Sequence, residues 1–169
     1  KADEILADPL LEILHNVLID NMRDGRETVV FIDEAHVIQD DRIFEELRLL
    51  LNFQLEDRFL LTLILCGQPE LKDKVSNLKQ LEQRIAIRCH LDKFGPEDTE
   101  KYIKHRLKVA GGSESIFTAE AIKFIYENSA GIPRRINRIC DLSLLSGFGK
   151  KAAAVDKQIV QQAVADFSV

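Results

Sequence analysis

The 169-residue sequence is poor in several features that define whole classes of protein. It has no tryptophan, one methionine, 8 glycines and 4 prolines. So little glycine and proline, together with 46% hydrophobic residues, excludes a fibrous or disordered chain. The longest apolar run, residues 59–67, is interrupted by Thr62 and is far shorter than the about 20 residues of a membrane helix. The composition predicts one globular domain, or one domain with a small appendage.

Positive charge and cysteine are also scarce. Lysine and arginine total 23 against 28 acidic residues, for a net charge of −5. Proteins that coat nucleic acid usually have a basic surplus, so this class is disfavoured, although a local basic face remains open. Cys66, Cys89 and Cys140 form no C-x-x-C pair, which favours a reducing compartment. Because the first residues contain neither a signal peptide nor an initiator methionine, we expect a piece of a longer cytoplasmic protein.

The spacing of apolar residues predicts alternating helices and strands in the first half of the chain. The segments 28–32 and 60–66 are short apolar runs of the kind found in strands buried on both faces. The segment 85–91 alternates apolar and polar residues, as an edge strand does. Pro9 is tolerable only near the first turn of its helix. This order predicts an α/β fold with a parallel, helix-covered sheet. The expected helices are 5–22, 42–53 and 70–84, and the expected strands are 28–32, 60–66 and 85–91.

From Gly95 onward the sequence predicts helices only. Their boundaries are marked by capping residues, glycines and prolines, and Phe117 is placed to pack on Ile122 as a hydrophobic staple. We therefore expect an α/β part at 1–93 and an all-helical part at 94–169. The boundary signals are Pro96 with glycines 111–112, Thr118, the segment 131–133 (GIP), and Asp156 before a last helix that includes Phe167.

Two adjacent carboxylates, Asp33 and Glu34, follow the strand at 28–32. They would lie at the carboxyl end of a parallel strand, where open α/β sheets bind ligands. One carboxylate can hold the water shell of Mg²⁺ while the next orients and deprotonates an attacking water, which is the Walker B arrangement. The alternative is a strand that ends at an acidic helix N-terminus, where the helix dipole favours negative charge.

Three further polar residues favour phosphate chemistry less strongly. Gln68 could hold an attacking water, or could belong to an ordinary strand-to-helix turn. Arg84 could reach the γ-phosphate of a neighbouring subunit, or could be a solvated cation at a helix end. Arg134, in the segment 131–138 (GIPRRINR), could bind phosphate at a helix N-terminus. With the two other arginines of that segment it could instead form a basic patch or a thin nucleic-acid footprint.

The order and spacing of these motifs resemble the AAA+ family of P-loop ATPases over nearly the whole chain. Five stretches are similar, more narrowly, to the general secretion pathway protein A branch, which holds the ExeA-type ATPases of type II secretion. They are 33–36 (DEAH), 46–50 (ELRLL), 66–71 (CGQPEL), 83–85 (QRI) and 131–138 (GIPRRINR). The resemblance implies a partial P-loop NTPase sheet followed by a helical lid. The implied ligands are ATP and Mg²⁺.

The resemblance also implies a role for each candidate residue. Asp33 would position Mg²⁺ through water and Glu34 would activate the attacking water. Gln68 falls at sensor 1, Arg84 at the arginine finger and Arg134 at sensor 2 in the lid. The implied partners are further copies of the protein in a ring or other oligomer and secretion or envelope-assembly proteins, with nucleic acid not favoured. The implied location is the cytoplasm, where regions or partners outside this chain could bring the protein to the inner membrane.

One family motif is missing from these residues. No G-x-x-x-x-G-K-[ST] loop occurs, and the nearest segment, 147–151 (GFGKK), lacks the leading glycine, the final hydroxyl and a preceding strand. In the family, this loop and two strands come before the point where this chain begins. We therefore expect a P-loop upstream in a longer protein, and no ATPase activity from this chain alone.

Three other interpretations stay open to different degrees. The segment 33–36 spells the motif of DEAH-box helicases, but 83–88 (QRIAIR) lacks the glycine of their Q-R-x-G-R motif and no S-A-T triplet occurs. An AAA+ helper of DNA transposition would share the same carboxylates and sensors. A non-catalytic interaction module would use the helical part to bind its neighbours.

Overall fold

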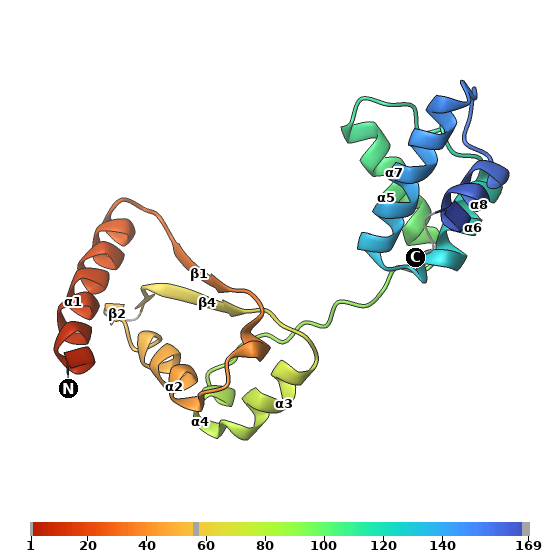
Figure 1. Ribbon diagram of the computed structural model, residues 1–169. Coiled ribbons are helices and arrows are strands. Elements are labelled where there is room, and N and C mark those ends of the chain that lie inside the picture. Colours follow the sequence, from red (N-terminus) through yellow and green to blue (C-terminus); the bar gives the residue numbers. More distant parts are fainter. Residues whose placement is uncertain (1, 56–57, 167–169) are drawn as a thin grey trace. The chain divides into compact units, whose positions relative to one another are not determined.

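The computed structural model describes residues 2–55 and 58–166. The chain divides into two compact units, the first ending at Arg88 and the second beginning at Cys89 (Figure 1). The first unit contains the β-strands, and the named elements of the second unit, as far as it is described, are helices, with an isolated bridge between Phe117 and Val155. Among the described residues, none of the helices combines the length and the apolar character that crossing a membrane requires.

The first unit is an α/β unit built on a pair of parallel strands. β1 and β4 run side by side in register, with Thr28 opposite Leu61 and Ile32 opposite Leu65. β2 and β3 form a separate antiparallel pair. The elements are α1 (Ala2–Arg23), β1 (Thr28–Ile32), the 3₁₀ helix η1 (Ala35–Val37), α2 (Asp41–Leu50), β2 (Gln54–Leu55), β3 (Arg58–Phe59), β4 (Leu61–Leu65), α3 (Glu70–Asn77) and α4 (Lys79–Glu82).

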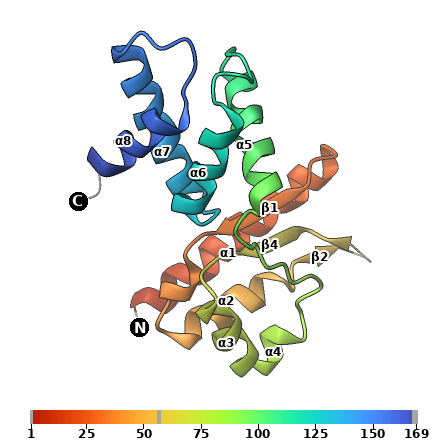
Figure 2. The same ribbon diagram turned by 90° about the vertical axis from the view of Figure 1, so that its right-hand side faces the viewer.

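Two apolar clusters hold the helices of the first unit against the sheet. Leu18 of α1 packs with Leu60, just before β4, and with Leu61, the first residue of β4. Phe44 of α2 packs with Val75 of α3 and with Leu81 of α4, in a second cluster. Figure 2 shows α2, α3 and α4 on one side of the β1–β4 pair. Each of these buried side chains contributes on the order of 1.5–3 kcal/mol to folding, and together they fix the segments that leave the ends of β1 and β4.

The third strand predicted at 85–91 is not present. Those residues have neither strand nor helix structure, although Ile85 packs against the cluster around Phe44. A strand is stable only where a neighbouring strand satisfies its backbone N–H and C=O groups. Among the described residues β1 and β4 pair with each other alone, so the alternating segment has no partner.

Burial of the two parallel strands also differs from the prediction. Along β1, Val29 is 54% exposed and Phe31 is 58% exposed, and Ile64 is exposed on β4. The other face of each strand carries the packed side chains, such as Leu61 and Leu63. The prediction of burial on both faces is therefore wrong for these residues, because the described helices pack on one face only.

Two helices of the first unit differ in detail from the pattern. The helix predicted at 70–84 is broken at Leu78, whose φ of −98° and ψ of 74° are not helical, into α3 and α4. The break turns the chain so that Leu81 is buried with Phe44 and Val75. Pro9 lies inside α1 and not in its first turn.

The second unit is a bundle of α5 (Pro96–Val109), α6 (Ala119–Ser129), α7 (Pro133–Gly149) and α8 (Lys157–Asp166). Two predicted caps are confirmed. Thr118 Oγ1 accepts a 3.2 Å hydrogen bond from Ala121 N, and Asp156 Oδ1 accepts a 2.9 Å bond from Ile159 N. Phe167, predicted to lie in the last helix, is outside the described residues. The core contains Ile103, Phe117, Ile122, Ile125, Ile136 and Val160.

Candidate functional site

The candidate site lies where β1 and β4 end. Because the two strands are parallel, the segment after Ile32 and the segment after Leu65 leave the same edge of the sheet. Backbone hydrogen bonds join them: Cys66 N donates to Ile32 O at 2.8 Å, and Ala35 N donates to Cys66 O at 2.8 Å. Ala35 is fully buried. The structure thus brings the segment of Asp33 and Glu34 beside the segment of Gln68.

Glu34 has an uncommon backbone conformation. Its φ of 53° and ψ of 29° are in the left-handed region, which costs a residue with a side chain roughly 1–2 kcal/mol. Its backbone N–H donates a 2.8 Å hydrogen bond to Asp33 Oδ1, so one predicted site residue holds the backbone of the other. The Glu34 side chain is 63% exposed. The conformation therefore turns an accessible carboxylate out from the end of β1.

His36 is a residue of this site that the sequence analysis did not assign. Its Nε2 lies 3.5 Å from Glu34 Oε2, and its Nδ1 accepts a 3.3 Å hydrogen bond from Gln68 N. The side chain is only 14% exposed. The one signal in the sequence was its place in the segment 33–36 (DEAH), which marks the position but not the contacts.

The carboxylates at this edge fit the Mg²⁺ that accompanies a nucleotide. Mg²⁺ in nucleotide sites is commonly held by one or two carboxylates, substrate phosphates and waters. Asp33 and Glu34 are both exposed and adjacent, which suits that arrangement. Among the described residues no group of three or more histidine, cysteine, aspartate or glutamate side chains could hold a metal ion by itself. The donor set therefore suits Mg²⁺ that arrives with phosphate and does not form a resident metal centre.

The glycine-rich segment 147–151 does not form a phosphate loop. Gly147 is buried within α7, where a Cβ would lie 3.1 Å from the Val155 side chain. Lys150, just after the helix, donates a hydrogen bond to Gln162 of α8. This segment therefore closes the helical bundle.

Arg84 is placed away from the two carboxylates of its own chain. Its Nη2 donates a 3.3 Å hydrogen bond to Asn52 Oδ1. The next residue, Phe53, accepts a backbone hydrogen bond from Leu60 N, just before β4 begins. Arg84 therefore lies toward the start of β4, whereas Asp33 and Glu34 lie at the other end of the parallel pair.

Arg134 lies in the second unit, in a segment whose other residues have clear structural roles. Gly131 has a φ of 72°, and its carbonyl oxygen accepts a 2.9 Å hydrogen bond from Phe94 N. Ile136 is fully buried, and Asn137 Oδ1 accepts a 3.0 Å hydrogen bond from the Tyr102 hydroxyl. Arg134 itself is exposed in the first turn of α7. Packing thus explains much of the GIPRRINR stretch, but it does not explain this arginine.

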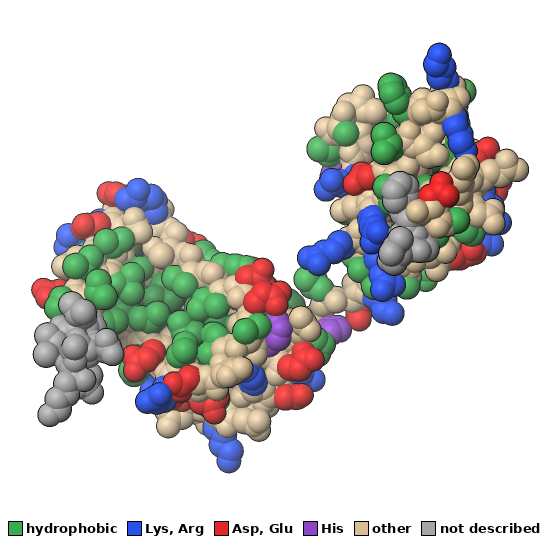
Figure 3. All heavy atoms as spheres, viewed as in Figure 1, with side chains coloured by type: hydrophobic (Ala, Val, Ile, Leu, Met, Phe, Trp, Pro, Cys, Tyr) green, Lys and Arg blue, Asp and Glu red, His purple; other side chains and the backbone are tan. Residues whose placement is uncertain are grey.

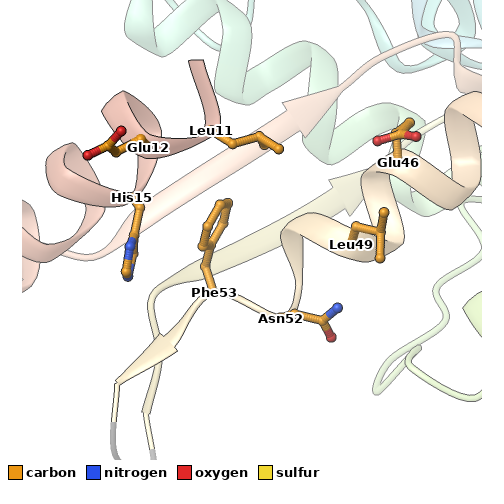
Figure 4. Close-up of a pocket in the computed structure, with 7 residues that line it drawn as sticks. All are labelled: Leu11, Glu12, His15, Glu46, Leu49, Asn52 and Phe53. Atoms are coloured by element: carbon orange, nitrogen blue, oxygen red, sulfur yellow. The ribbon is translucent and has the colours of Figure 1, made fainter. Parts of the chain in front are cut away.

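A hollow of about 440 Å³ lies elsewhere, between α1 and α2 (Figure 4). Figure 3 shows hydrophobic side chains gathered on this face of the first unit. Glu12 and Glu46 line the hollow and would repel a phosphate, and among the described residues no lysine or arginine lines it. The charge of its lining therefore disfavours nucleotide binding in this hollow. The lining residues are Leu11, Glu12, His15, Glu46, Leu49, Asn52 and Phe53.

Comparison with known proteins assigns the family. Residues 6–75 match the AAA domain family. The chain is 39% identical over 144 residues to general secretion pathway protein A of Aeromonas hydrophila, an alignment that covers 83% of this chain and 26% of that protein. Residues 6–75 are therefore part of an AAA domain. The resemblance carried by the DEAH and GQPEL motifs is thereby confirmed, and the chain spans about a quarter of the length of general secretion pathway protein A.

A second curated relative and several solved structures also match the chain. An HTH-type transcriptional regulator of Methanocaldococcus jannaschii is 27% identical over 80% of this chain and 34% of its own length. The Holliday junction branch migration motor RuvB of Thermotoga maritima matches with a TM-score of 0.67 and 20% identity, over 92% of this chain and 50% of RuvB. The ORC2 protein of Aeropyrum pernix matches with a TM-score of 0.69 and 15% identity, over 92% and 43%. At these identities the two structural matches show the fold alone, which is that of the AAA+ P-loop ATPases.

Proposed function

We propose that this chain supplies the Walker B, sensor and lid residues of a protein that binds and hydrolyses MgATP. The observation that carries the proposal is the junction of Asp33 and Glu34 with the Gln68 segment at one edge of a parallel sheet, made by the Ala35–Cys66 hydrogen bond. This edge is where α/β sheets of this kind bind their ligands. The AAA domain match of residues 6–75 makes phosphoryl transfer the chemistry to expect there.

Each residue of the edge has a role that its position supports. Bound Mg²⁺ supplies positive charge to the phosphates, and Asp33 would hold it through water. Glu34, whose carboxylate is accessible, would accept a proton from the attacking water. Gln68 begins the turn into α3, from which its side-chain amide would orient that water.

The arginines would act from other positions. The Arg84 guanidinium contacts Asn52, whose neighbour Phe53 is hydrogen-bonded just before the start of β4, and it would act on the nucleotide of a neighbouring subunit. Arg134, in the first turn of α7, would bind the γ-phosphate and couple it to the position of the lid. The role of Arg84 requires an oligomer, which the proposal therefore includes.

The biological setting in the proposal rests on the 39% identity to a general secretion pathway protein. We propose that hydrolysis drives assembly or remodelling of secretion or envelope proteins from the cytoplasmic side of the inner membrane. This setting concerns the full-length protein, since the chain spans 26% of that relative.

The substitution Glu34→Gln in the full-length protein tests the proposed chemistry. Glutamine keeps the size and the hydrogen-bonding capacity of the side chain but is not a proton acceptor at neutral pH. We expect ATP to remain bound and steady-state turnover to fall by roughly a hundredfold or more. Glu127→Gln, which changes an exposed glutamate of α6, is the matched control and should leave turnover unchanged. Full turnover in the Glu34→Gln protein would remove Glu34 as the base.

A DNA-directed role is the second candidate, favoured by one surface of α7. Arg134, Arg135 and Arg138 are all exposed near the start of that helix, and the RuvB motor that shares this fold acts on Holliday junctions. Duplex DNA titrated at several salt concentrations separates the two roles. Affinity that falls steeply with salt and is lost on Arg135→Ala would favour DNA. No binding at low salt would favour the secretion role.

A further inference from the structure

His36 contacts both halves of the site, and none of the proposed catalytic roles uses it. Its ring lies between the Glu34 carboxylate, 3.5 Å from Nε2, and the backbone N–H of Gln68, which donates to Nδ1 at 3.3 Å. With 14% of its side chain exposed, the ring is largely enclosed at the end of the sheet. It therefore links the segment after β1 to the segment after β4 through side-chain atoms, in addition to the backbone bonds.

The hydrogen bond from Gln68 determines which ring nitrogen carries the proton. A neutral imidazole has one nitrogen that accepts and one that donates. Because Nδ1 accepts from the Gln68 N–H, the proton lies on Nε2. That N–H is on the side of the ring that faces Glu34 Oε2. The segment of Gln68 thus sets up a donor directed at the carboxylate of Glu34.

Two neighbours hold His36 in this place. Gly67 leaves room for it, because a Cβ at that position would lie 3.1 Å from both the backbone N and Nδ1 of His36. Lys74 of α3 donates from Nζ to the carbonyl oxygens of His36 at 2.6 Å and Ile38 at 2.5 Å. The residue is therefore fixed on its main chain by α3 and on its ring by the loop that leads into α3.

We propose that His36 is a positioning residue, which directs the Glu34 carboxylate and makes its placement depend on where the Gln68 loop lies. The role given to Glu34 rests on the proposed function. The Nε2–Oε2 separation of 3.5 Å is longer than an ordinary hydrogen bond, as is common for catalytic contacts before the substrate binds. Because Gln68 N is hydrogen-bonded to Nδ1, a shift of the Gln68 loop would move the ring and so change this contact.

Three variants of the full-length protein test the role in turnover. His36→Leu removes both contacts. We expect kcat to fall roughly tenfold to a hundredfold, which is the usual effect of losing a residue that orients a functional group without touching the substrate. The KM for MgATP should be unchanged. His36→Gln places an amide donor where Nε2 stands, and it should recover part of the lost kcat. His105→Leu, at an exposed histidine of α5, is the matched control and should behave as wild type. Unchanged kcat in His36→Leu, or an effect on KM alone, would overturn the proposal.

The position of the proton on the His36 ring can be measured without an ATPase assay. In this chain labelled with ¹⁵N-histidine, a long-range ¹H–¹⁵N correlation spectrum reports which His36 nitrogen carries the proton. We expect the proton on Nε2, and we expect Glu34→Gln to move the Nε2 signal of His36 while leaving those of His90 and His105 in place. A proton on Nδ1, or an Nε2 signal that does not shift in Glu34→Gln, would overturn the proposed contact between His36 and Glu34.

The two experiments fail in different ways. If the wild-type protein does not hydrolyse MgATP, the proposed function is wrong and the positioning role is wrong with it, whatever the ring spectrum shows. If wild type hydrolyses MgATP, the kinetic role of Glu34 is decided by Glu34→Gln, and that of His36 by the contrast between His36→Leu and His36→Gln. Normal kcat in His36→Leu beside an inactive Glu34→Gln would refute the inference alone.

Discussion

The backbone of Gly131 lies so close to Phe94 that a Cβ on Gly131 would be 2.0 Å from the Phe94 carbonyl oxygen. Phe94 N also donates a 2.9 Å hydrogen bond to the Gly131 carbonyl oxygen, which ties the segment before α5 to the turn between α6 and α7. With a φ of 72°, Gly131 is in a conformation that other residues adopt only under strain. The glycine of the GIPRRINR stretch is thus required by the packing of the second unit.

Gly131→Ala should destabilise the second unit. The left-handed backbone and the overlap with Phe94 together predict a loss of about 2–4 kcal/mol in the free energy of unfolding, measured by urea titration. Gly149→Ala is the matched control, because nothing lies within 4 Å of a Cβ there. The control should be neutral or stabilising by up to about 1 kcal/mol. Equal stability of the two variants would contradict this account of the motif.

Cys140 should be the least reactive thiol at neutral pH. Burial, with a smaller contribution from the charge of Asp141, raises the pKa of the Cys140 thiol from 9.0 to about 12. Iodoacetamide at pH 8 should therefore label the exposed Cys89 well before Cys140, as peptide mapping would show. Cys140 should react at a comparable rate only after the chain is unfolded in urea.

The raised pKa of Cys140 also predicts that the free energy of unfolding falls at alkaline pH. A thiol whose pKa is higher in the folded state stabilises the fold fully below pH 9 and loses that contribution as pH rises toward 12. Replacing Cys140 with alanine should therefore flatten the fall of unfolding free energy between pH 9 and pH 11. An identical pH profile in wild type and Cys140→Ala would show that another group is responsible.

Arg84 should act on a neighbouring subunit. Because its guanidinium hydrogen-bonds to Asn52, away from Asp33 and Glu34 of its own chain, Arg84→Ala and Glu34→Gln subunits should complement each other when mixed. We expect ATPase activity to reappear in mixtures of the two inactive full-length variants. Arg88→Ala, which breaks an exposed ion pair with Glu82, is the control and should remain active alone. If no mixing ratio restored activity, Arg84 would not be the arginine finger.

Elements that depend on local spacing were predictable from the sequence. β1 has the predicted limits, because TVVFI is a short β-branched run bounded by polar residues. The caps at Thr118 and Asp156 depend on side chains a few residues from their partners, so they too were visible. The α/β order of the first unit followed from the alternation of such segments.

What the sequence did not show depends on contacts between distant segments. The residues at 85–91 alternate as a strand would, but pairing decides whether a strand forms, and β1 and β4 leave them no partner among the described residues. The break at Leu78 serves the burial of Leu81 against Phe44, which lies far away in sequence. The contact of His36 with the Gln68 backbone joins residues 32 positions apart, so spacing alone gave no sign of it.

The most direct test of the site is the Mg²⁺ dependence of ATP binding in the full-length Asp33→Asn protein. Titration calorimetry with MgATP, and with ATP in excess EDTA, separates the affinity contributed by the metal from that of the nucleotide. If Asp33 and Glu34 form the Walker B pair, wild type should bind MgATP more tightly than metal-free ATP, and Asp33→Asn should bind both equally. A Mg²⁺ effect that survives unchanged in Asp33→Asn would place the metal elsewhere and contradict the account.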